Sequence, residues 1–89
     1  MNSSGSWELE IDPDFFKQLR RIPKDYSRHI LEVVEDLRQN PFAGDIQKMK
    51  DDKDTWRRRV GVYRIFYEIF PDEKAIRVFH VERRTSKTY

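Results

Sequence analysis

The segment TWRRRVGVYRIFYEIF, residues 55–70, decides the fold that we predict for this chain of 89 residues. It is typical of two β-strands, 55–60 and 62–70, joined by a turn at Gly61. Because successive side chains of a strand point to opposite faces, every second residue of 62–70 shares one face. That face carries Tyr63, Ile65, Tyr67 and Ile69. It therefore needs a hydrophobic cover.

The opposite face of these strands carries arginines. Alternation places Arg64 there beside Phe66, and a further strand predicted over 75–82 continues to Arg83 on the same face. If the hairpin keeps the first strand in phase, one groove is lined by Arg57, Arg59, Arg64 and Arg83. Arg58 falls on the opposite face. His80 has the same parity as Ile76 and Val78, which predicts a histidine packed in the core.

The first half of the chain supplies the cover. Residues 7–11 alternate like a short strand, and Asp12 with Pro13 is typical of the start of a helix that runs to Pro23. Apolar residues at three- and four-residue spacing predict a second helix over 24–40. A long loop, 41–54, with a brief strand around 46–50, leads to the hairpin.

The predicted order of elements is thus β-α-α-β-β-β. The fold class is α+β: one two-layer domain over residues 1–89, in which a helical hairpin covers one face of an antiparallel sheet. The open face then remains available for binding.

The composition excludes several classes of function. Cysteine is absent, so disulfides and Cys nucleophiles are not expected. No apolar run reaches the roughly 20 residues of a membrane span, so we predict a soluble cytoplasmic protein with no membrane partner. Residues 1–45 hold 6 Lys and Arg against 9 Asp and Glu, whereas residues 46–89 hold 12 against 7. The second half is therefore the basic half.

These motifs resemble the RelE/ParE toxin superfamily of toxin–antitoxin systems. The resemblance rests on WRRRVGVYRIFYEI, on IRVFHVERRTSKTY and on the β-α-α unit with its IPKD turn, and it covers roughly residues 7–89. The arginine pair followed by a late tyrosine points to the RelE branch of mRNA interferases. The resemblance implies a toxin that cleaves mRNA in the A site of the 70S ribosome and is neutralised by a cognate RelB-like antitoxin.

The resemblance also implies which residues act. Its catalytic positions fall on Arg57, Arg64, Arg83 and Tyr89, with Arg84 competing with Arg83 for one role. The basic residues expected to contact mRNA and 16S rRNA are Lys48, Lys50, Lys53, Arg59, Arg84 and Lys87.

The chemistry of RNA cleavage divides the roles. Without a metal, the reaction needs a base for the 2′-OH, positive charge on the phosphorane-like transition state and an acid for the leaving 5′ oxygen. Arginine stays protonated and supplies only the charge. Tyr89, whose phenolate the nearby guanidiniums would favour, is the best proton-transfer group, with His80 and Glu68 in reserve. The spacing of acids and histidines indicates no metal site, and no cofactor is expected.

Two other functions stay open. One is a ParE-like inhibitor of DNA gyrase without nuclease activity, and the other is a basic RNA-binding domain without enzymatic activity. Convergence of the four catalytic positions would favour the nuclease. On the open face, Phe66 and Phe79 could floor the groove, stack a base or receive an antitoxin helix.

Overall fold

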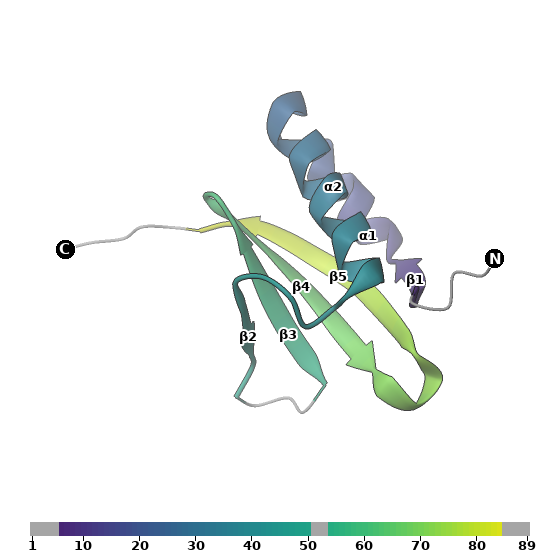
Figure 1. The fold of residues 1–89 in the computed structure, drawn as a ribbon. Helices are drawn as coiled ribbons and strands as arrows, with labels where there is room; N and C mark the ends of the chain where they lie inside the picture. Colours follow the sequence, from purple (N-terminus) through teal and green to yellow (C-terminus); the bar gives the residue numbers. More distant parts are fainter. Residues whose placement is uncertain (1–5, 51–53, 85–89) are drawn as a thin grey trace.

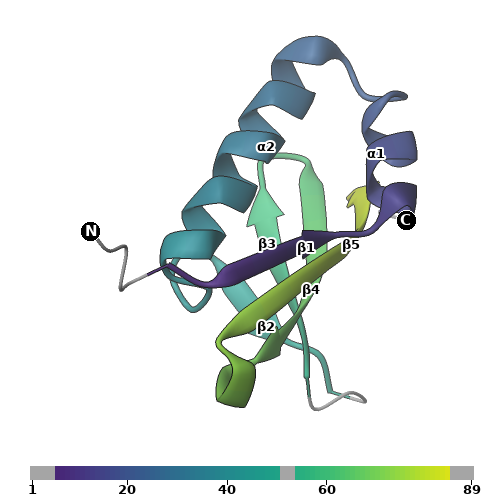
Figure 2. The ribbon, with the colours of Figure 1, turned by 90° about the vertical axis from the view of Figure 1, so that its right-hand side faces the viewer.

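A computed structural model describes residues 6–50 and 54–84 of the chain. Within these residues, two helices lie on one side of a five-stranded sheet (Figures 1 and 2). The elements in chain order are β1 (Glu8–Ile11), α1 (Pro13–Leu19), α2 (Lys24–Gln39), β2 (Ile46–Lys48), β3 (Thr55–Val60), β4 (Tyr63–Phe70), the short 3₁₀-helix η1 (Pro71–Glu73) and β5 (Ala75–Arg83). The predicted α+β class is confirmed, and β2 is the brief strand predicted within the long loop.

The sheet is mixed rather than wholly antiparallel. Its strand order is β1-β5-β4-β3-β2, and neighbouring strands are antiparallel except β1 and β5. Leu9 of β1 pairs with Ile76 of β5, and Ile11 pairs with Val78. The two helices connect β1, at one edge of the sheet, to β2 at the opposite edge. The chain then returns strand by strand, and its last strand, β5, pairs with β1 in parallel.

The helices begin where the sequence predicts. Asp12 accepts a hydrogen bond from the backbone N of Asp14 at 2.9 Å, and Pro13 occupies the first turn of α1. The helix ends at Leu19 rather than running to Pro23, and α2 begins directly after that proline. The apolar stripe of α2 is buried and consists of Ile30, Val33, Val34 and Leu37.

The core lies between the helices and the sheet. Its β4 residues are Tyr63, Ile65, Tyr67 and Ile69, all buried as alternation predicts. They pack in one cluster with Phe15 of α1, the α2 stripe, and Ile76, Val78 and Val81 of β5. Because burying one such large apolar side chain stabilises a protein by about 1.5–3 kcal/mol, this cluster fixes the face on which the helices pack. The other face of the sheet stays open.

An extra residue in β5 changes the alternation near the end of that strand. Phe66 pairs with His80 but Tyr67 pairs with Val78, so Phe79 is the inserted residue of a β-bulge. Val78 is buried, whereas Phe79 and His80 are both half-buried. The predicted core position of His80 is wrong, because the bulge turns His80 to the side of Phe66, with ring centroids 5.3 Å apart.

The same bulge moves Arg83 away from the open face. Arg83 pairs with the buried Tyr63, and it lines a hollow together with Gln18 and Ile22 of the helical layer. The prediction that Arg83 stands beside Arg64 is therefore wrong, because it assumed unbroken alternation along β5.

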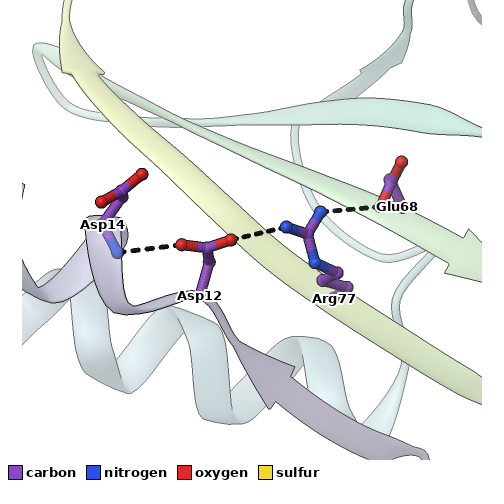
Figure 3. A network of polar contacts seen from close by, with 4 residues as sticks. All are labelled: Asp12, Asp14, Glu68 and Arg77. Atoms are coloured by element: carbon purple, nitrogen blue, oxygen red, sulfur yellow. Dashed lines mark hydrogen bonds and ion pairs between the residues drawn. The ribbon is translucent and has the colours of Figure 1, made fainter.

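A polar network joins the start of α1 to β4 and β5 (Figure 3). The guanidinium of Arg77 donates to Glu68 at 3.1 Å and to Asp12, the residue that also caps α1. The hydrogen bond to Glu68 is the main cause that raises the pKa of Arg77 above its ordinary value. Glu68, a reserve proton-transfer group in the sequence analysis, thus has a structural partner on β5.

The segment between α2 and β2 is anchored on the helix-covered side of the sheet. The hydroxyl of Tyr67 donates to the carbonyl of Pro41 at 2.9 Å, and both residues are buried. Burial raises the pKa of Tyr67, so the phenol keeps its proton and remains a donor. The side chain of Arg58 packs so closely on Gly44 that a Cβ built there would lie 2.5 Å from its Cζ. Arg58 therefore supports this segment.

Replacing Tyr67 with Phe should lower the free energy of unfolding by about 1–3 kcal/mol, because the buried carbonyl of Pro41 loses its donor. Urea unfolding followed by tryptophan fluorescence measures this loss. Tyr26→Phe is the control, since Tyr26 is 52% exposed on α2 and should be close to neutral. Equal losses in the two variants would contradict the anchoring role of Tyr67.

Candidate functional site

Within the described residues, three arginines converge on the open face of the sheet. Arg57 and Arg59 of β3 share a face with Arg64 of β4, because Arg59 pairs with Arg64 and Arg57 pairs with Phe66. Together with Asp45 and Gln47 they line a concavity of about 130 Å³. We call Arg57, Arg59 and Arg64 the arginine cluster. The structure thus brings together three of the four arginines that the sequence places in one groove.

Each arginine of the cluster has a polar neighbour in the chain. Arg57 donates to the side-chain oxygen of Gln47 at 2.7 Å. Arg59 lies 3.9 Å from a carboxylate oxygen of Asp45, and Arg64 lies 3.7 Å from one of Glu82. Such half-exposed ion pairs contribute at most about 1 kcal/mol, so an anion of higher charge can compete with these carboxylates for the guanidiniums.

A chain of hydrogen bonds connects α1 to the cluster through Glu82. The side-chain oxygen of Gln18 accepts from the backbone N of Val81 at 2.8 Å, which leaves its amide nitrogen to donate to Nδ1 of His80 at 3.0 Å. The imidazole proton then lies on Nε2, which donates to Glu82 at 3.1 Å. Gln18 and His80 therefore hold the carboxylate that faces Arg64.

A second, larger cavity adjoins the arginine cluster. It has a volume of about 500 Å³ and shares Arg57 and Gln47 with the first concavity. We call it the aromatic pocket; its lining residues are Gln47, Lys48, Met49, Lys50, Thr55, Arg57, Phe66 and Phe79. Two of the predicted RNA-contacting lysines, Lys48 and Lys50, thus lie beside two aromatic rings. The open face combines positive charge with ring surface.

The remaining predicted residues lie elsewhere. Arg83 is exposed and lines a hollow beside the connection between α1 and α2. Arg84 donates through Nη1 to the carbonyl of Gly61 at 3.3 Å, which ties Arg84 to the β3–β4 turn. Lys53, Lys87 and Tyr89 lie outside the described residues. The predicted convergence of four catalytic positions is therefore observed for Arg57 and Arg64 alone among the positions that the structure describes.

Sequence reasoning missed the neutral and acidic members of the site. Gln47 reaches Arg57 because β2 pairs with β3 in a register that sets these two residues side by side, and a three-residue strand is too short for its alternation to indicate that register. Glu82 faces Arg64 across the β4–β5 pair because the bulge shifts β5 by one residue. An acidic residue next to the late arginine pair was the available signal.

Neither a metal centre nor a membrane helix is present in the described part of the chain. Over residues 6–50 and 54–84, no group of three His, Asp or Glu side chains is arranged to hold a metal ion. Within the same ranges, neither helix is long and apolar enough to cross a membrane.

The match of the chain to a known family model shows that it is a toxin of a type II toxin–antitoxin system. Residues 9–87 match the family model described as "ParE toxin of type II toxin-antitoxin system, parDE", and the chain belongs to this family. The resemblance to the RelE/ParE superfamily is thereby confirmed.

Individual relatives carry the RelE name. A curated relative from Methanocaldococcus jannaschii named RelE1 is 27% identical over 81 residues, which cover 88% of this chain and 90% of the relative. The archaeal RelE–RelB complex from Pyrococcus horikoshii OT3 contains a chain with 25% identity and a TM-score of 0.81, with coverage of 92% of this chain and 99% of that one. The isolated E. coli RelE toxin shares the fold, with 14% identity and a TM-score of 0.77. The superposition covers 92% of this chain and 88% of the E. coli chain.

Replacing Glu82 with Gln should strengthen the binding of inorganic phosphate about two- to fivefold, because it removes the carboxylate that competes for Arg64. Calorimetric titration at low ionic strength measures this affinity. Glu35→Gln is the matched control, since Glu35 pairs with Arg38 on α2. Unchanged or weaker phosphate binding by the Glu82 variant would show that this carboxylate does not compete.

Proposed function

We propose that this toxin is a metal-independent endoribonuclease that cleaves mRNA in the A site of the ribosome and so blocks translation. The arginine cluster carries the proposal, because three guanidiniums on one face suit the charge and geometry of a phosphodiester. The adjoining aromatic rings suit single-stranded RNA, whose unstacked bases are free to bind them. Relatives at 25–27% identity that bear the RelE name support the same branch. Action on 70S ribosomes places the protein in the cytoplasm.

The proposed reaction is an attack by the RNA on its own phosphate. The 2′-OH loses its proton and its oxygen bonds to phosphorus, the bond from phosphorus to the 5′ oxygen breaks, and that oxygen takes up a proton. The products are a 2′,3′-cyclic phosphate and a 5′-OH. Negative charge gathers on the non-bridging oxygens in the transition state, where Arg57 and Arg64 would neutralise it.

The proton transfers need a group other than arginine, which stays protonated. We assign them to Tyr89 on the family resemblance; this residue lies outside the described residues. Lys48 and Lys50, on the rim of the aromatic pocket, would hold flanking phosphates of the mRNA or of 16S rRNA. Lys53 and Lys87 are proposed for the same role. Arg83 is left out, because it lies on the helix-covered side of the sheet.

Replacing Arg64 with Ala should slow single-turnover cleavage of mRNA on programmed ribosomes by about 10²-fold or more, because one transition-state contact is lost. Ribosome binding should fall far less. Arg28→Ala is the control, since Arg28 is exposed on α2 and its replacement removes the same charge away from the arginine cluster. Equal losses in both variants would mean that bulk charge, rather than a positioned phosphate clamp, accounts for the activity.

Induction of the toxin in cells gives an independent test of the target. Cleavage within translated reading frames is the expected result. Intact mRNA together with a DNA-damage response that depends on gyrase would contradict the proposal and would favour inhibition of DNA gyrase.

The proposed antitoxin is a RelB-like protein with an acidic amphipathic segment. Solved relatives are described as complexes of RelE with RelB. In this chain, the two helices form a groove of about 420 Å³ in which Phe16 and Leu31 are exposed beside the basic residues Arg20 and Lys24. An amphipathic helix can bury such apolar side chains, and its acidic residues would meet the basic rim.

Leu31→Ser should weaken binding of the co-expressed antitoxin about tenfold or more, because it places a hydroxyl in an apolar groove. Affinity of the purified toxin for the antitoxin measures the effect. Val62→Ser is the control, because Val62 is also 39% exposed but lies at the β3–β4 turn. If the antitoxin binds both variants as tightly as the wild type, its binding site lies outside the groove between the helices.

A further inference from the structure

We propose that the aromatic pocket binds one base of single-stranded RNA, namely a base whose own phosphate lies in the arginine cluster. This inference rests on the proposed function, since it assigns a base site beside the proposed phosphate site. It names the class of ligand, a nucleotide with an unstacked base, and the residues that would hold the base.

The bulge in β5 creates the aromatic surface. In an unbroken strand, Phe79 and His80 would point to opposite faces, but the inserted residue leaves both half-buried on the side of Phe66. Phe66 and Phe79 line the pocket, while His80 packs against Phe66 with ring centroids 5.3 Å apart. A strand pair whose role was to build a core would bury these rings rather than leave them partly exposed.

The rings are held in place before any ligand arrives. The guanidinium of Arg77 lies 5.5 Å from the centroid of Phe79, and hydrogen bonds to Asp12 and Glu68 fix that guanidinium. On the other ring, His80 is itself held between Gln18 and Glu82. A preorganised ring loses little side-chain entropy on binding, so more of the stacking free energy is available for affinity.

The pocket and the arginine cluster are joined by two shared residues. Arg57 and Gln47 line both cavities, so a phosphate held by Arg57 and Arg64 has the aromatic pocket beside it. The pocket volume of about 500 Å³ lies in the range of small-molecule sites and exceeds the needs of one base. Thr55 and Gln47 bring a hydroxyl and an amide to the same wall, and these groups can meet the polar edge of a base.

The test compares two probes that differ in the base. Adenosine 5′-monophosphate carries a base, the sugar and a 5′-phosphate, whereas ribose 5-phosphate carries the same sugar and phosphate without the base. We expect the isolated toxin to bind the nucleotide about tenfold more tightly or better, because stacking of one base on an aromatic side chain is commonly worth that much. Calorimetric titration gives both affinities, and backbone amide chemical shifts should map the nucleotide to Phe66 and Phe79.

Three variants separate the base site from the phosphate site, and a fourth is the control. Phe66→Ala should abolish the preference for the nucleotide and leave the affinity for ribose 5-phosphate unchanged, and Phe66→Leu, which keeps apolar volume for folding, should do the same. Arg64→Ala should weaken both probes. Phe70→Ala, on the same strand and face but outside both cavities, should preserve the preference.

The result decides the base site independently of cleavage. Equal affinities for the two probes, or a nucleotide preference that survives both substitutions of Phe66, would overturn it. Cleavage on ribosomes that still depends on Arg64 would in that case leave the proposed nuclease function intact.

Discussion

The β-bulge at Phe79 determines what the open face of this toxin presents. With one residue inserted opposite Phe66, the strand keeps Val78 and Val81 in the core and still exposes two consecutive rings between them. The same shift sets Glu82 opposite Arg64 and turns Arg83 toward the helices. The aromatic pocket, the carboxylate beside the arginine cluster and the loss of a fourth arginine from that face all depend on this one irregularity in the ladder.

Local patterns in the sequence were sufficient for the regular parts of the fold. The alternation in β4 and the apolar stripe of α2 each repeat over several residues, so the buried faces and the position of Arg64 followed directly. Arg57 and Arg59 were placed correctly because a tight turn at Gly61 keeps β3 in phase with β4. These features depend on side chains close together in the chain.

The rest depended on contacts between distant segments. The bulge has no signature in VFHVER, because each of its residues suits a regular strand, and the choice is made by the partner strand and the core. The parallel pairing of β1 with β5 is set by the path of the helices rather than by WELEI. Asp45 and Gln47 reach the arginines because Tyr67 and Arg58 anchor the preceding segment, a tertiary contact that propensity does not encode.

The pairing of the first strand with the last also has a consequence for synthesis of the toxin. β1 pairs with Ala75–Val78, Asp12 accepts a hydrogen bond from Arg77, and Gln18 accepts one from the backbone N of Val81. During translation, the N-terminal strand and α1 must therefore wait until β5 has left the ribosome, and contacts of such long sequence separation form slowly. The nascent toxin can form the β3–β4 hairpin with its three arginines early, but its open face is complete only when β5 adds Phe79 and Glu82, which gives a newly made antitoxin time to meet the toxin.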